Sequence, residues 1–182
     1  IWLLYYIAGA VGIAYWIVYI ARFVYPIEQP LAHSVAWIVN LISNQIGIPT
    51  RIFQNAPGVL LVLVIVQEVG WTVLNIGVES SGLLEMSVLV SLISFYPGWS
   101  MKRRLASISG GLIATWVANI FRMLLIVVML HVLGKRALVL AHTYLGKLFF
   151  FLLTIGIYWY LVTLPTIRNL VLLPKSSKGT NT

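Results

Sequence analysis

The chain contains no cysteine and no aspartate, and only four of its 182 residues are acidic. Without cysteine it has no disulfide and no cysteine-ligated metal site. Charged residues of both signs make up 9% of the chain, against about a quarter in an average soluble domain. So few charges cannot cover a surface that faces water, and this excludes a sizeable soluble domain.

Apolar residues are abundant instead, at 60% of the chain. A membrane-spanning helix needs about 20 of them, so this length allows roughly five or six spans with short loops. The formal net charge is +8. Most of the cations lie between or beyond apolar runs, which indicates binding to membrane lipid headgroups and predicts no nucleic-acid partner.

The apolar runs predict an all-α polytopic membrane protein, a bundle of about five transmembrane helices in one domain over residues 1–165. Residues 166–182 form a polar tail that is predicted to be cytoplasmic. The predicted spans lie at about 1–22, 31–48, 81–97, 105–133 and 138–164.

The segment 49–79 differs in amino-acid composition from these runs. It is rich in valine and isoleucine, and Gly58, Gly70 and Gly77 interrupt it. Two interpretations stay open for it: a strand, turn and strand, or one more span over 60–76 with Glu68 buried inside.

Orientation follows from the cations between spans. Lys102, Arg103 and Arg104 form the densest cluster, which predicts a cytoplasmic loop there. Alternation of the spans then places Arg22 in the cytoplasm as well, and it places 49–79 on the extracytoplasmic side.

The first polar candidate is the run Glu79, Ser80, Ser81 and Gly82 at the predicted start of a helix. A serine there is a preferred helix cap, and an acid suits the helix dipole. A nucleophile in the same place would meet positive potential and free backbone N–H groups, which lower a thiol's pKa and can hold an oxyanion.

Two later runs also carry polar candidates. Asn119 and Arg122 share one helical face with Thr115, and a buried cation in an apolar helix normally faces an interior or a wet cavity. His142 lies near the predicted outer start of the last helix, where a polar cap is the ordinary role. Together with Ser80, these residues could supply the nucleophile, acid–base group and oxyanion stabiliser of acyl transfer.

These segments, taken in order, resemble the exosortase/archaeosortase family of membrane transpeptidases. Gly47-Ile48-Pro49 resembles the family's G-I-P turn, and Glu79-Ser80-Ser81-Gly82-Leu83 resembles its E-C-S-G-L motif. Asn119-Ile120-Phe121-Arg122 resembles N-x-x-R, and the segment from His142 to Gly146 resembles H-x-x-x-G. The compact chain is similar in length to the type-G exosortases of Gram-positive bacteria.

The resemblance implies a sorting-type transpeptidase or cysteine protease in a prokaryotic plasma membrane, with its active site facing the extracytoplasmic side and no cofactor or metal. Its substrate would be the C-terminal sorting-signal tail of a membrane-threaded protein. The nucleophile would stand at position 80, Arg122 would hold the oxyanion or orient the thiolate, and His142 would protonate the leaving amine. Glu79, Ser81 and Asn119 would support them, with Asn119 positioning Arg122.

Ser80 departs from the family, which has its nucleophilic cysteine there. The chain is either a Cys-to-Ser form or a natural serine variant, and in both cases activity of the sequence as written is in doubt because an alkoxide is hard to generate near neutral pH. Two other functions stay open. One is an intramembrane serine protease that uses Ser80 or Ser81 with His142. The other is a transporter or flippase of a lipid or small solute that uses Glu68, Glu85, Arg122 and Lys147.

Overall fold

A computed structural model describes residues 2–54, 61–67, 70–76, 78–96, 98–134 and 139–172 of the chain. Two helical segments precede a small sheet, and the remaining helices follow it. The first part comprises α1 (Trp2–Tyr19), its π-helical continuation η1 (Ile20–Val24) and α2 (Glu28–Gln45). The sheet comprises β1 (Thr50–Gln54), β2 (Leu61–Gln67) and β3 (Gly70–Ile76).

After the sheet, the short turn α3 (Val78–Ser81) leads into α4 (Leu83–Ser94), and the long helix α5 (Met101–Leu133) follows. The last helix is wound in four stretches that join end to end. They are η3 (Leu140–Leu145), α6 (Gly146–Tyr158), η4 (Trp159–Thr163) and α7 (Leu164–Leu172), of which η3 and η4 are π-helical.

Among the described residues, three helices are long and apolar enough to cross a membrane, so the chain is a helical membrane protein as its composition predicts. They cover Tyr6–Val24, Met101–Leu133 and Leu140–Arg168. The other two predicted spans, 31–48 and 81–97, fall on α2 and on the apolar but shorter α4. The 12 residues of α4 extend only about 18 Å. The count of five spans therefore stays a prediction.

The segment before α3 is a three-stranded antiparallel sheet in the order β1-β2-β3. Gln67 pairs with Gly70, so β2 and β3 form a hairpin, which is the strand–turn–strand alternative and not an additional span. β1 pairs with the other edge of β2. Sequence reasoning missed β1 because Thr50–Gln54 carries no run of branched apolar residues.

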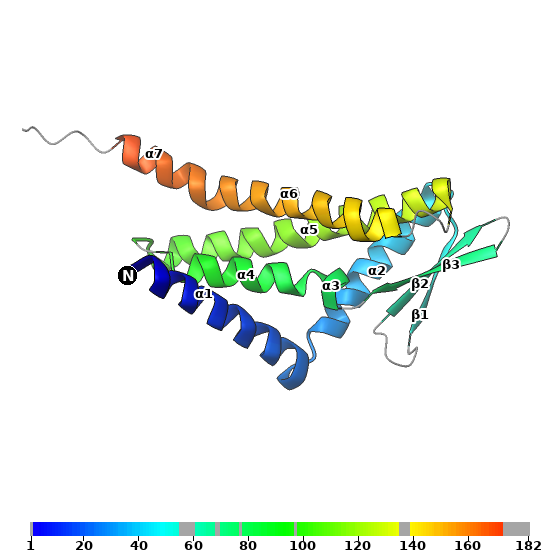
Figure 1. The fold of residues 1–182 in the computed structure, drawn as a ribbon, viewed down its shortest axis with the longest axis horizontal. Helices are drawn as coiled ribbons and strands as arrows, with labels where there is room; N and C mark the ends of the chain where they lie inside the picture. Colours follow the sequence, from blue (N-terminus) through cyan, green and yellow to red (C-terminus); the bar gives the residue numbers. More distant parts are fainter. Residues whose placement is uncertain are drawn as a thin grey trace, which may run out of the picture.

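Figure 1 shows α1, α4, α5 and α6 side by side, with the sheet beyond one end of this bundle and the N-terminus and α7 at the other. We call these the sheet end and the Lys102 end. α2 does not run back along the bundle but leads obliquely towards the sheet (Figure 1).

The main core lies where α2 packs on α5 and the sheet. Ala32, Val35, Ala36 and Val39 recur at helical spacing on one face of α2 and are fully or almost fully buried. They contact buried residues of β3 and of the second half of α5, which include Leu74, Ile76, Met123, Ile126 and Leu130. The polar end of α2 is joined to β1, because Thr50 Oγ1 donates a hydrogen bond to Asn40 Oδ1 at 2.7 Å. This packing fixes the sheet beside the end of α5.

The position of Arg22 differs from the prediction. α1 runs antiparallel to α4, because the Tyr6 hydroxyl bonds to the Leu92 carbonyl at 3.0 Å and the Ser91 hydroxyl bonds to the Ala10 carbonyl. The end of α1 therefore lies at the start of α4, at the sheet end. The prediction that Arg22 shares an end with residues 102–104 was wrong, since it required α2 to return along the bundle.

Candidate functional site

The corner between α3 and α4 holds the two serines of the first motif. Ser80 and Ser81 are both buried, at 3% and 0% exposure. Gly82 has a φ of +80°, a left-handed conformation that glycine adopts without strain. The Ser81 hydroxyl accepts a hydrogen bond from the Leu83 N–H at 3.3 Å, a local bond that holds the turn at this corner. Glu79 belongs to α3, but its side chain lies outside the part that the structure describes.

Asn119 of α5 packs directly on this corner. Its Nδ2 donates a hydrogen bond to the Ser80 carbonyl at 2.9 Å, and Asn119 is fully buried. A Cβ on Gly82 would lie 3.2 Å from the same Nδ2, so the glycine also permits the close approach. Sequence analysis assigned Asn119 to the positioning of Arg122, whereas this bond shows that it holds the backbone at Ser80.

Arg122 lies one helical turn beyond Asn119 on the buried face of α5, at 2% exposure. Its guanidinium carbon is 5.1 Å from the ring centroid of Phe150 in α6, a cation–π distance. A cation inside an apolar bundle is normally directed at an interior or a wet cavity. Arg122 meets this expectation, because it lines a cavity of about 640 Å³ between α4, α5 and the last helix.

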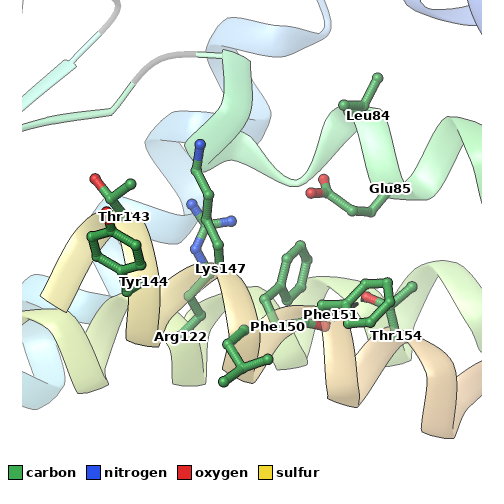
Figure 2. A pocket seen from close by; sticks show the side chains of 10 residues that line it. Leu84, Glu85, Arg122, Thr143, Tyr144, Lys147, Phe150, Phe151 and Thr154 are labelled. Carbon is green, nitrogen blue, oxygen red and sulfur yellow. Dashed lines mark hydrogen bonds between the residues drawn. The ribbon is translucent and has the colours of Figure 1, made fainter. Parts of the chain in front are cut away.

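The charged residues of the cavity come from three elements, as Figure 2 shows. Glu85 extends from α4 towards the side of the cavity that carries the cations. Arg122 extends from α5, and Lys147 extends from α6. Thr143 and Tyr144 of η3 and Thr154 of α6 are the other polar residues of the lining. In the sequence, Glu85 and Lys147 were given only a part in transport, although intramembrane ionisable residues are a signal for a site.

His142 lies in η3, immediately before Thr143, and is half-buried. It is not among the described residues that line the cavity. The structure thus brings Ser80 into contact with Asn119 and places Arg122 at the cavity. Like His142, Ser80 is not among the described residues that line the cavity, so the three predicted catalytic residues do not share one cavity wall.

Gly146, the glycine of the H-x-x-x-G segment, packs closely on Ile126 of α5. A Cβ there would lie 2.9 Å from the Ala141 carbonyl oxygen and 2.9 Å from Ile126 Cδ1. Real Cβ atoms essentially never come this close to a backbone atom, so a larger residue would shift η3 and His142 with it.

We expect Gly146→Ala to destabilise the protein by about 1–3 kcal/mol, the usual cost of overpacking a tight contact. Gly156→Ala is the matched control, because Gly156 lies in the same helix with no atom within 4 Å of the added methyl group. There alanine should be neutral or slightly stabilising. Thermal unfolding in detergent measures both, and equal melting temperatures for the two variants would contradict the close contact.

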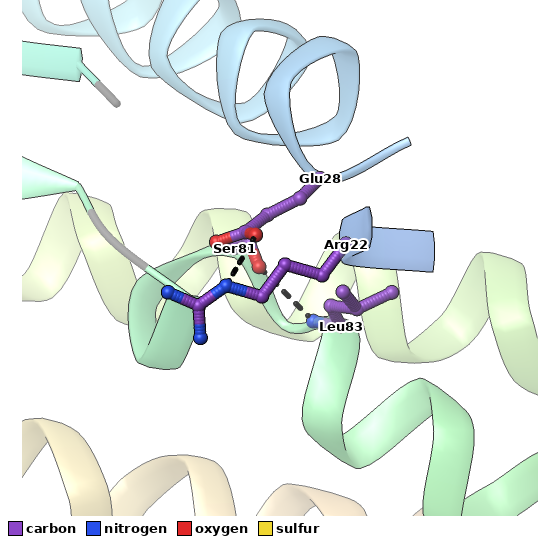
Figure 3. Close-up of polar contacts among 4 residues, drawn as sticks. All are labelled: Arg22, Glu28, Ser81 and Leu83. Carbon is purple, nitrogen blue, oxygen red and sulfur yellow. Dashed lines mark hydrogen bonds and ion pairs between the residues drawn. The ribbon is translucent and has the colours of Figure 1, made fainter. Parts of the chain in front are cut away.

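A second polar pair lies near the serine corner, where α2 packs on α3. Arg22 Nε is 3.9 Å from Glu28 Oε2, and Figure 3 shows this pair in one view with Ser81 and Leu83. Glu28 is 4% exposed, whereas the Arg22 side chain is half exposed. Burial raises the pKa of Glu28, and the Arg22 guanidinium offsets only part of that rise.

A raised carboxyl pKa means that the folded state disfavours the ionised form. Stability should therefore fall as the pH rises from the ordinary value of 4.5 through the folded pKa of Glu28. We expect Glu28→Gln to flatten this fall, with a melting temperature about 2–4 °C above the parent's at pH 8. Arg22→Gln should steepen it. Melting curves at pH 5 and pH 8 test both, and a Glu28→Gln variant that loses stability only at pH 8 would contradict the assignment.

The fold and the cavity define a helical membrane protein with a polar site inside its apolar bundle. No group of three His, Cys, Asp or Glu side chains that could hold a metal ion occurs among the described residues. Comparison with protein-family models, curated proteins and solved structures finds no match for this chain.

Proposed function

We propose that the chain is a membrane-embedded acyl-transfer enzyme of the exosortase/archaeosortase type, and that with Ser80 at the nucleophile position it is a Cys-to-Ser form with little or no activity. Its substrate is the C-terminal tail of a membrane-threaded protein. The observation that carries the proposal is the Asn119–Ser80 hydrogen bond, because it joins the serine motif to the N-x-x-R segment 39 residues away. Arg122 then follows on the same helical face and lines the cavity.

In the proposed reaction, a cysteine thiolate at position 80 attacks a peptide carbonyl carbon. The sulfur–carbon bond forms while the carbonyl electron pair moves to oxygen, where the Arg122 guanidinium stabilises the charge. The carbon–nitrogen bond then breaks, and the leaving amine takes a proton from a general acid. The family resemblance implies that His142 is this general acid. A second nucleophile attacks the thioester and releases the sulfur.

The bonds of the two buried serines support different roles for them. The Ser81 hydroxyl accepts the Leu83 N–H and so holds the turn. Ser80 is held through its backbone carbonyl by Asn119, so its hydroxyl is not the group that holds the corner. Exchange of Ser80 for cysteine is the direct test, and its expected result is set out in the Discussion.

We also propose that the sheet end faces the extracytoplasmic side of a prokaryotic plasma membrane. Lys102, Arg103 and Arg104 lie together at the other end, and Arg168 follows at the end of the last long apolar helix. Because α2 stays near the sheet end, this orientation needs four crossings, by α1, by α3 with α4, by α5 and by the last helix, in place of the five spans that the sequence predicts.

The cysteine-free chain makes this orientation testable with single cysteines. Asn75→Cys, at an exposed position of β3, should react with a membrane-impermeant maleimide in intact cells. Lys102→Cys should react only after the membrane is permeabilised. Labelling of both in permeabilised cells controls for accessibility, and the reverse pattern in intact cells would overturn the orientation.

A further inference from the structure

The cavity at Arg122 does not end there. A second cavity, of about 380 Å³, continues from it along α4 and the last helix towards the Lys102 end. The two cavities share four lining residues, Leu84, Glu85, Phe151 and Thr154. They therefore form one continuous depression, which we call the α4–α6 groove.

The chemistry changes along this groove. Its polar end carries Glu85, Arg122 and Lys147. Beyond Thr154, whose hydroxyl bonds back to the Phe150 carbonyl, the walls are almost wholly apolar and include Val88, Leu92, Ile155 and Trp159. From Lys147 to Thr163 the groove follows 16 residues of helix, or about 24 Å.

The walls are open to a ligand that arrives from the bilayer. Phe151 is 61% exposed, Trp159 is 54% exposed and Val88 is 42% exposed. Large apolar side chains at this depth would contact lipid tails in the absence of a ligand. A helix with an apolar surface can replace those tails without exposing any polar group.

We infer that the α4–α6 groove binds the substrate as a peptide in two conformations: helical along the apolar walls and unwound at the polar end, where Glu85, Arg122 and Lys147 contact its backbone. This inference rests on the proposed function and adds the site at which the transmembrane helix of the substrate docks. The physical reason is that a scissile peptide bond within a helix is inaccessible to a nucleophile. Unwinding it exposes backbone N–H and C=O groups, which are costly in hydrocarbon without partners.

The polar end supplies both kinds of partner. Arg122 and Lys147 donate hydrogen bonds, which suits peptide carbonyls, and Glu85 accepts them, which suits peptide N–H groups. An anionic lipid headgroup would be matched by cations alone and would be repelled by the carboxylate. Arg122 also lies 12 residues before Gly134, the residue that follows α5, about 18 Å along the helix, which is deep for a headgroup.

Photocrosslinking tests the groove in the chain as it stands, because binding needs no chemistry at Ser80. A benzophenone amino acid would replace Phe151 or Ile155 on the groove wall. The control replaces Leu152, which is 58% exposed on the same helix but does not line the groove. The probe is a synthetic peptide with a Gly-Pro break, a Leu/Ala helix of about 20 residues and terminal lysines, reconstituted in liposomes.

We expect peptide crosslinks at Phe151 and Ile155 about tenfold above those at Leu152, with a loss of yield when Ala-Leu replaces the Gly-Pro break. A tenfold ratio of crosslink yields corresponds to a modest preference of the peptide for the groove over the surface at Leu152. Equal yields at Ile155 and Leu152, or crosslinks to phospholipid in place of peptide, would overturn the inference.

A second measurement separates this inference from the proposed function. In a Ser80→Cys background that processes the peptide, Ile155→Trp should lower the rate about tenfold by filling the groove, and Leu152→Trp should leave it unchanged. An unchanged rate in the Ile155→Trp variant would overturn the docking of the substrate in the groove, while the proposed enzyme activity would stand. If the peptide crosslinks in the groove but no Ser80→Cys preparation processes it, docking in the groove stands and the proposed enzyme activity is overturned.

Discussion

Ser80→Cys should convert an inactive chain into one that cleaves membrane-threaded tail peptides, with a rate more than about a thousandfold above the parent. The reason is ionisation: a cysteine is a few per cent thiolate at neutral pH, whereas a serine hydroxyl is almost never ionised without a strong base. Arg122, which follows Asn119 on the same face of α5, would favour the thiolate further. Mass spectrometry would detect either the cleaved peptide or a thioester adduct that hydroxylamine releases.

Ser81→Cys is the matched control for this result. Ser81 is the neighbouring residue and equally buried, but its hydroxyl accepts the Leu83 N–H and does not occupy the proposed nucleophile position. It should gain no activity and should lose some stability, because sulfur is a weak acceptor in place of the hydroxyl oxygen. Activity from Ser81→Cys alone would place the nucleophile one residue later. If neither variant processes a broad set of tail peptides but the purified protein moves a lipid or solute, a transporter replaces the enzyme.

Arg122→Ala, added to Ser80→Cys, should lower the rate of processing by a factor on the order of 10² to 10³. That is the usual loss when one group that stabilises a developing oxyanion is removed. Arg122 lines the cavity one helical turn beyond Asn119, and in the proposed reaction its cation would face the charge that develops at a bound carbonyl. Single-turnover measurement of thioester formation isolates this step from release of the product.

Arg103→Ala provides the control for loss of a cation from the same helix. Arg103 also stacks on an aromatic ring, with its guanidinium carbon 4.3 Å from the Trp99 ring centroid, but it lies at the Lys102 end of α5. It should not change the rate. Because Arg122 is buried, its loss could also destabilise the bundle, so the melting temperature of each variant is measured alongside. If the rate of the Arg122→Ala variant falls only in proportion to the amount of folded protein, Arg122 has a structural role and no role in the reaction.

Several features of this protein follow from the sequence alone. Helical membrane character follows from composition, because a chain with 9% charged residues has too few charges to cover a water-facing surface. The start of a helix near Ser80 also follows from residue types, since serine and an acidic residue favour the first turn of a helix. The hairpin of β2 and β3 was one of two alternatives for its segment, because an apolar run of that length suits a strand pair or a span.

Other features were decided only by tertiary structure. Arg22 lies at the sheet end because Tyr6 bonds to Leu92, 86 residues away, and so sets α1 antiparallel to α4. Asn119 holds the Ser80 carbonyl because α5 packs on the corner. Glu85 and Lys147 line the same cavity because of the way α4 and the last helix are arranged around it. Hydropathy and capping act within a few residues of the chain, whereas the partner of each helix face depends on contacts between segments that no local pattern specifies.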